Sequence, residues 1–422
     1  MKILFLCDCA SIAGVETLMC RMAMFCPKDW EFIFLVTFNR PSPEILEKLK
    51  KTGCIVINGG NFRLSLLCNT KKKLQKIFQS QQLNHIDFIY SVHCISFIYA
   101  HFIKKHNFPN AKILTGVYHP TEYGWHSKKK NYLERLMLRV LSKTSPENIF
   151  FMNQDVRNKH SELIGLDFSK SPITPIGIDF LNLSIIIRNP KKFKIVSVGR
   201  LCDFKTYNFL MLDVMQDLHR ADNRFTYHIY GHGKLEKKIK NEIKIRNLEN
   251  IVFFHGKLPY EKYSEVMQDA FIFIGMGTAL IEAAASGVPA LIAIEREKEA
   301  VTYGWFYLEK GYNIGEFVFN KNRFKFFDLI FDISKDTEEH YLNHSKLSKI
   351  KAEEFSILNL IDGFTAHASR AKETKTNISW WEYFCFCVDF KFNYFLKKCG
   401  RTSSYSDHHF SEEFTSVQFN LK

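Results

Sequence analysis

Residues Phe271–Pro289 read FIFIGMGTALIEAAASGVP, an apolar run followed by two glycines and a series of small residues. The run Phe271–Ile274 contains no polar residue, which is typical of a strand buried on both faces of a parallel sheet. Gly275 and Gly277 predict a turn, and the small residues after them predict a helix that stops before Pro289. A buried strand that turns directly into a helix predicts an α/β fold.

The start of this predicted helix is a candidate phosphate site. The backbone amides of Gly277, Thr278 and Ala279 would lie at the positive end of the helix dipole, which favours an anion. Glu282 lies one turn further along, within reach of ribose hydroxyls. A carboxylate near a helix start also stabilises the helix without a ligand, so both interpretations of Glu282 stay open.

The same alternation of apolar runs and helical segments extends along most of the chain. Strands are predicted at 3–7, 32–37, 54–57, 88–91, 113–117 and 149–152, and again at 195–198, 227–230, 251–254, 271–274 and 290–294. Prolines and turn residues predict a linker over 165–192. We therefore predict two facing, doubly wound, Rossmann-like domains, with a ligand cleft between them at the carboxyl ends of their strands. The predicted divisions are residues 1–180 and 190–375, followed by an aromatic return segment and polar tail at 376–422.

Composition restricts the partners. The 422 residues carry 58 Lys and Arg against 44 Asp and Glu, a net charge of +14, which predicts an anionic partner. Nucleic acid is not expected, because the aromatic residues lie in apolar runs and are not interleaved with basic residues. Eleven irregularly spaced cysteines and no apolar stretch near ~20 residues predict a reduced, cytoplasmic protein, attached at most to the inner face of a membrane.

Two cations follow the first predicted strand of the second domain. The segment Gly199–Lys205 places Arg200 and Lys205 just beyond the strand's carboxyl end. Arginine and lysine together can neutralise a pyrophosphate, one as a bidentate fork and the other as a point charge. The alternative is a pair of solvated surface cations. In the first domain, Gly14 precedes a predicted helix and would let a ligand approach backbone amides, although many such turns carry one glycine for geometry alone.

Six short motifs occur in an order that resembles a known family. They are Ala13–Glu16, Pro175–Asp179, Val198–Leu201 with Lys205, Tyr230–Gly233, Val252–Gly256 and Glu282–Pro289. Over about residues 1–320 the set resembles the retaining glycosyltransferases of family 4, which have the GT-B fold. The resemblance implies that a nucleotide diphosphate sugar is held mainly by the second domain and an acceptor by the first.

The resemblance also implies roles for individual residues. Arg200 and Lys205 would bind the diphosphate, and Glu282 the ribose. The turn at Gly277, Thr278 and Ala279 would contact phosphate and sugar, Gly256, Lys257 and Leu258 would lie near the base, and Gly14 would face the donor phosphates from the first domain. One departure stands out, because the family's first glutamate, eight positions before the second, is Ile274 here. Nearby Glu295, Glu297 and Glu299 cannot be assigned that role from a charge run.

Three further candidates lie in the first domain. His93 and His119 each follow a predicted strand and should point into the cleft. His119 resembles the family's histidine at that strand end, which implies contact with the transferred sugar, although a lone histidine at a strand end is often structural. Glu122 is a further candidate acid.

Two segments could contact a membrane. The segment from Lys128 to Leu141 predicts a basic amphipathic helix, which suits either an anionic membrane surface or an ordinary domain helix; Lys71–Lys73 adds to the basic character of this domain. The aromatic run from Trp380 to Leu396 predicts a helix that docks on the first domain, with a membrane-interface anchor as the alternative.

Together these features predict a glycosyltransferase that moves a hexose-type unit, with retention, from a nucleotide diphosphate sugar to a glycan or lipid-linked saccharide. Surface polysaccharide or glycoconjugate biosynthesis is the expected setting. No cofactor or metal is expected, because the cations and the helix start would stabilise the leaving diphosphate. The alternatives are a nucleotide-sugar epimerase or phosphorylase of the same architecture, and a non-catalytic scaffolding subunit.

Overall fold

A computed structural model describes residues 1–7, 14–37, 43–58, 70–123, 132–180, 193–375 and 378–399. Lys128–Lys130, the tail from Gly400 and residues 181–192 of the predicted linker lie outside the described residues. The chain forms two compact units, one made of Met1–Pro175 with Leu360–Lys422, and the other of Ile176–Asn359. Each unit is described by itself.

The first unit contains a parallel sheet of order β3-β2-β1-β4-β5-β6. All six strands that the sequence predicts for this half are present. Except in the edge strand β3, their central residues are buried, because apolar side chains on both faces are covered by helices. The strands are β1 (Lys2–Cys7), β2 (Glu31–Val36), β3 (Ile55–Asn58), β4 (Phe88–Ser91), β5 (Lys112–Val117) and β6 (Ile149–Phe151).

The helices of this unit come from both ends of the chain. The N-terminal part supplies α1 (Gly14–Phe25), α2 (Pro43–Lys51), α3 (Thr70–Ser80), α4 (Cys94–His106), α5 (Tyr132–Leu141) and α6 (Gln154–Ile164), with a short 3₁₀ turn at Pro146–Asn148. The C-terminal part supplies most of α13 (Ile357–Arg370) and α14 (Trp380–Lys398). Phe364 of α13 lies 5.2 Å from Tyr90 and 5.6 Å from Phe150, measured between ring centroids. The chain therefore returns to the first unit at Leu360, whereas the sequence assigns residues up to 375 to the second domain.

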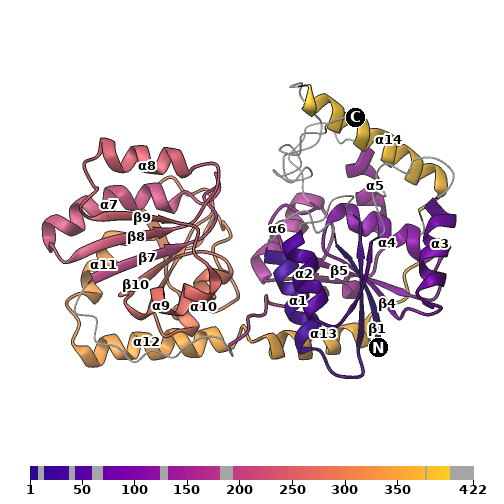
Figure 1. Ribbon diagram of the computed structural model, residues 1–422, viewed down its shortest axis with the longest axis horizontal. Helices are drawn as coiled ribbons and strands as arrows, with labels where there is room; N and C mark the ends of the chain where they lie inside the picture. The colour runs from indigo at the N-terminus through magenta and orange to yellow at the C-terminus, as the bar shows by residue number, and fades with distance from the viewer. Residues whose placement is uncertain are drawn as a thin grey trace. The chain divides into compact units, whose positions relative to one another are not determined.

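Helix α14 docks on α5 and α4 (Figure 1). Glu382 forms an ion pair with Arg139 of α5 at 2.5 Å. Tyr383 stacks on Phe102 of α4 with 4.3 Å between ring centroids. The apolar face of α5 is buried, at Leu133, Leu136, Met137, Val140 and Leu141. α5 is thus a domain helix, and the aromatic segment docks on the first unit as the sequence predicts.

The second unit has a sheet of order β13-β12-β11-β10-β7-β8-β9. Its parallel strands confirm the five predicted ones, and β12 and β13 add an antiparallel edge that the sequence does not predict. These two strands escape prediction because they follow a charged run and β13 has only two residues. The strands are β7 (Phe193–Val198), β8 (Phe225–Tyr230), β9 (Val252–Gly256), β10 (Ile272–Gly275), β11 (Ala290–Ala293), β12 (Val301–Trp305) and β13 (Phe324–Lys325).

Helices flank this second sheet (Figure 1). They are α7 (Tyr207–Ala221), α8 (Glu236–Ile245), α9 (Tyr263–Gln268), α10 (Thr278–Ala285), α11 (Phe326–Ile333) and α12 (Glu338–Glu353), with 3₁₀ turns at Tyr260–Lys262 and Phe306–Leu308. One face of α7 is buried, at Met211, Val214, Met215 and Leu218. The central strand β7 has β8 on one side and β10 on the other, so the strand order changes direction between β7 and β10. Open α/β sheets bind ligands at the carboxyl ends of such strands.

Candidate functional site

Backbone hydrogen bonds join the loops at the carboxyl edge of the second sheet. The amide of Gly199, after β7, donates to the carbonyl of Tyr230 at 3.0 Å, and the amide of Gly231 donates to the carbonyl of Gly256 at 2.7 Å. A Cβ atom on Gly231 would lie only 2.1 Å from the carbonyl oxygen of Gly199, so the approach requires glycine there. Three motifs that are distant in sequence therefore lie side by side, and the turn with Lys257 and Leu258 directly follows the last of them.

Lys205 is the most perturbed cation at this edge. Its ammonium group lies 3.1 Å from the position that a Cβ of Gly199 would take, so the side chain lies over that glycine. Burial is the main cause that lowers the pKa of Lys205 to about 8, and the positive charge of Arg200 contributes to this lowering. Arg200 itself is exposed. Because Arg200 disfavours the charged form of Lys205, an anion bound beside these two residues would be stabilised.

The start of α10 differs in one respect from the sequence prediction. Gly277 has a φ of +73°, which suits glycine, and its amide donates a hydrogen bond to the carbonyl of Ile314 at 2.8 Å. That amide is therefore already hydrogen-bonded within the protein. The predicted phosphate contact would involve the amides of Thr278 and Ala279. The carbonyl of Ala279 accepts a hydrogen bond from the hydroxyl of Tyr263 at 2.9 Å. Glu282 is buried, with 6% of its surface exposed.

Ile274 stands where the resembling family has its first glutamate, and its surroundings explain the difference. It lies inside β10, pairs with Leu291 of β11 and is fully buried in the apolar core. A carboxylate at that position would be buried among apolar side chains, which is costly. The strand runs directly into the Gly-Met-Gly turn, so position 274 belongs to the core and not to the site.

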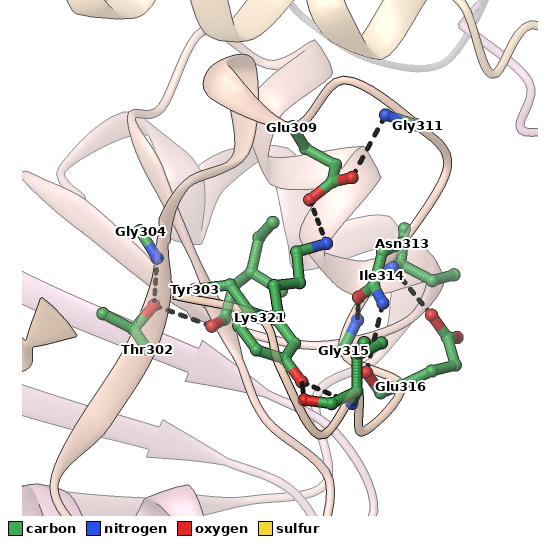
Figure 2. A network of polar contacts seen from close by, with 12 residues as sticks. Thr302, Tyr303, Gly304, Glu309, Gly311, Asn313, Ile314, Gly315, Glu316 and Lys321 are labelled. Carbon is green, nitrogen blue, oxygen red and sulfur yellow. Dashed lines mark hydrogen bonds and ion pairs between the residues drawn. The ribbon is translucent and has the colours of Figure 1, made fainter. Parts of the chain in front are cut away.

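The segment 313–316 packs against the Gly-Met-Gly turn. A Cβ atom on Gly315 would lie 2.6 Å from the Cβ of Met276. The buried carboxylate of Glu316 accepts a hydrogen bond from the amide of Ile314 at 2.9 Å, and the side-chain amide of Asn313 donates to the carbonyl of Glu316 at 3.1 Å. Figure 2 shows these bonds beside the ion pair of Glu309 with Lys321, 2.5 Å long. This network supports the turn from which α10 starts.

The three glutamates after β11 have different surroundings. Glu297 forms an ion pair with Arg323 at 3.1 Å, and its other oxygen accepts a hydrogen bond from the amide of Lys298. Glu299 is exposed. Glu295 is buried, and its carboxylate lies 3.4 Å from Nε of Arg296. The sequence does not single out Arg296, because nothing in a run of charged residues indicates which of them contacts another loop. In the structure the amide of Arg296 bonds to the loop that contains Phe204.

The candidates of the first unit lie at the carboxyl ends of its strands. Gly14 is the exposed first residue of α1. His119 follows β5, and its Nδ1 accepts a hydrogen bond from the amide of Thr121 at 3.2 Å. A backbone amide can only donate, so neutral His119 carries its proton on Nε2.

Glu122 and His93 lie together at the start of α4. The buried carboxylate of Glu122 accepts a hydrogen bond from the amide of Cys94 at 2.7 Å, which places it at the positive end of the helix dipole. Its second oxygen lies 3.8 Å from Nδ1 of His93, the residue that precedes the helix. Glu122 therefore caps α4, a structural role that sequence reasoning does not reveal.

Among the described residues, no three His, Cys, Asp or Glu side chains are grouped so as to hold a metal ion. None of the described helices combines the length and apolar character needed to cross a bilayer.

Comparison with known proteins identifies the architecture. Residues 183–301 match the family model described as Glycosyl transferases group 1. The Anabaena protein Alr3699/HepE, solved in complex with UDP-glucose, is 14% identical; the match covers 88% of this chain and 100% of that one, with a TM-score of 0.64. The chain has the GT-B fold. A glycosyltransferase from Rickettsia africae ESF-5 is 16% identical to this GT-B chain. The match covers 87% of this chain and 98% of the Rickettsia chain, with a TM-score of 0.63.

Two curated relatives match part of the GT-B chain. The amylovoran biosynthesis glycosyltransferase AmsK of Erwinia amylovora is 28% identical over 142 residues, 30% of this chain and 35% of the relative. The putative colanic acid biosynthesis glycosyltransferase WcaL of Escherichia coli K12 is 26% identical over 160 residues, 34% of this chain and 39% of the relative. The chain thus matches little more than a third of the length of these relatives.

Proposed function

We propose that this protein is a retaining glycosyltransferase of the family 4 type. It would transfer a hexose-type unit from a nucleotide diphosphate sugar to a glycan or lipid-linked saccharide, in polysaccharide or glycoconjugate biosynthesis. The observation that carries the proposal is Lys205, whose pKa is lowered to about 8 beside Arg200 at the carboxyl edge of the second sheet. The UDP and UDP-glucose complexes of the Anabaena protein support a nucleotide-sugar donor.

The second unit would bind the donor. Arg200 and Lys205, with the amides of Thr278 and Ala279, would stabilise the diphosphate as negative charge develops on it during departure. These groups already supply positive potential, so the proposal requires neither a metal ion nor another cofactor. Glu282 would bind the ribose, and the turn formed by Gly256, Lys257 and Leu258 would lie against the base.

The first unit would bind the acceptor and contact the transferred sugar. His119 is held with its proton on Nε2, so this nitrogen can donate a hydrogen bond to a sugar hydroxyl or to the developing charge. Gly14, at the start of α1, would contact the donor phosphates. His93 would be a second contact to sugar or acceptor, and Glu122 would position it through the start of α4.

We propose that the protein binds to the cytoplasmic face of an anionic membrane. The outward face of α14 exposes Trp381, Val388, Phe392 and Phe395, each by 45% or more, while its inward face is buried at Tyr383, Phe386 and Phe390. These outward residues recur at spacings of seven, four and three, so they form one stripe along the helix. A water-facing stripe without a polar residue is unusual, and aromatic side chains beside basic ones suit a lipid interface.

The first unit also exposes Lys72, Lys73 and Lys76 on α3, and the whole chain has a net charge of +14. This positive charge favours anionic lipid over a neutral partner.

A binding screen with UDP-, GDP- and ADP-linked sugars tests the donor site. We expect one base to be preferred, and we expect Lys205→Ala and Glu282→Ala to abolish or strongly weaken binding and transfer. Lys237→Ala, which removes an exposed lysine from α8, is the matched control and should change neither. Unchanged binding and transfer in the Lys205 and Glu282 variants would refute this site.

The alternatives give different results in the same assays. An epimerase or phosphorylase would convert the donor without an acceptor. A scaffolding subunit, which Ile274 in place of the family's first glutamate would favour, would bind nucleotide sugar and transfer nothing. Transfer to an added acceptor with retained anomeric configuration, detected by NMR, supports the proposal over both.

A further inference from the structure

The backbone of Arg296 adopts an unusual conformation. Its φ is +56°, in the left-handed region that non-glycine residues avoid, and among the described non-glycine residues only Gln82 and Asn247 share this feature. Glycine would occupy this position without strain. A side chain that is kept at an energetic cost indicates that the side chain itself is needed there.

Two hydrogen bonds hold the loop that carries Arg296. The amide of Arg296 donates to the carbonyl of Phe204 at 2.8 Å, and Phe204 directly precedes Lys205. The amide of Glu295 donates to the carbonyl of Gly315 at 2.8 Å, in the segment that supports the start of α10. The loop after β11 therefore bridges the two parts of the candidate donor site.

The loop turns one cation outward. Ile294, Glu295 and Glu297 are buried, whereas the side chain of Arg296 is 69% exposed. The carboxylate of Glu295 lies 3.4 Å from Nε of Arg296 and orients the base of the guanidinium. The two terminal amino groups of the fork lie at the other end, and a guanidinium fork matches the geometry of phosphate oxygens.

We propose that Arg296 is a third diphosphate-binding cation, beside Arg200 and Lys205. This inference rests on the proposed function and adds to it a residue that neither the family motifs nor the charge pattern indicates. The hydrogen bond to Phe204 holds the backbone of Arg296 against the residue next to Lys205, and the exposed guanidinium would bind the same anion. Glu295 acts as a positioning residue for this guanidinium.

Two substitutions separate a binding role from a structural one. Arg296→Gly removes the cation and relieves the backbone strain, so the protein should unfold at the same temperature or higher. Arg296→Lys keeps the charge and the strain but removes the fork. Asn247→Gly is the matched control, because it relieves a positive φ of 53° elsewhere in the same unit without removing a charge.

Isothermal titration with UDP-glucose, UDP and inorganic pyrophosphate measures the effect on the full chain. Loss of one charge-assisted contact predicts an affinity about 10- to 100-fold lower for Arg296→Gly, and a smaller loss for Arg296→Lys. Asn247→Gly should bind like the unmodified protein. If the unmodified protein binds a diphosphate and Arg296→Gly binds it equally well, the assignment of Arg296 is overturned and the proposed function stands. If the unmodified protein binds none of the three probes and no GDP- or ADP-linked sugar, both are overturned.

Discussion

The amide of Gly277 donates a hydrogen bond to the carbonyl of Ile314 at 2.8 Å. The bond joins the turn before α10 to a segment 37 residues further along the chain, so the start of that helix is set by a distant loop. Gly315, the next residue of that loop, has a φ of +124°. The network of Figure 2 makes this loop a support for the predicted phosphate site.

Gly315→Ala should destabilise the second unit. The new Cβ would lie 2.6 Å from the Cβ of Met276 and 2.7 Å from the carbonyl oxygen of Ala293, and the backbone angle disfavours alanine. We expect a loss of about 2 kcal/mol or more in the free energy of unfolding, measured with urea. Gly363→Ala is the control: it lies in α13 with open space around it, so alanine should stabilise by about 0.5–1 kcal/mol. Equal stability of the two variants would contradict the supporting role of this loop.

The affinity for nucleotide sugar should fall as pH rises through about 8. In the free protein the pKa of Lys205 is lowered from 10.5 to about 8 by burial, so the ammonium group is charged below pH 8 and loses its proton above it. A bound diphosphate favours the charged form and raises this pKa, so binding above pH 8 must take up a proton. We expect constant affinity for UDP-glucose between pH 6 and 7.5 and a decline of up to about tenfold per pH unit above 8.

Calorimetry in two buffers of different ionisation enthalpy would detect that proton uptake directly. Lys205→Arg keeps its charge over the whole range and is the control. A pH-independent affinity of the unmodified protein up to pH 10 would show that Lys205 does not contact the diphosphate.

Glu122→Gln should weaken the first unit by about 1 kcal/mol, because it removes a buried negative charge from the start of α4 while keeping the side-chain shape. The measurement is urea unfolding of the full chain. Glu44→Gln makes the same change in the exposed first turn of α2 and should cost only a few tenths of a kcal/mol. If Glu122→Gln abolishes transfer without a loss of stability, Glu122 acts as an acid and not as a cap.

The two faces of α14 should respond differently to substitution. Phe386→Ala removes a buried ring and should cost about 3–5 kcal/mol of stability. Trp381→Ser changes an exposed ring and should alter stability by no more than about 0.5 kcal/mol, while lowering cosedimentation with vesicles that contain anionic lipid. Unchanged cosedimentation of Trp381→Ser would argue against a membrane role for the stripe. If the unmodified protein dimerises with rising concentration and Trp381→Ser does not, the stripe binds a second copy of the chain.

Much of the fold follows from local patterns in the sequence. Each parallel strand, buried on both faces, is a short continuous apolar run, and glycines and prolines mark the turns, so the predicted parallel strands and the two-domain plan agree with the structure. The gathering of Arg200, Lys205 and the start of α10 at one edge also follows, because carboxyl ends of parallel strands share an edge.

What the sequence could not determine depends on contacts between distant segments. The return of the chain to the first unit at Leu360, the antiparallel edge of β12 and β13, and the engagement of the Gly277 amide by Ile314 all arise from such contacts. The hydrogen bond from the amide of Arg296 to the carbonyl of Phe204 also joins two segments that are distant in sequence. By itself the sequence determined the parallel strands and the turns between them, since each is encoded by neighbouring residues. Only the tertiary structure decided which amides, carboxylates and cations remain at the site, because backbone hydrogen bonds between loops engage some of them and turn others outward.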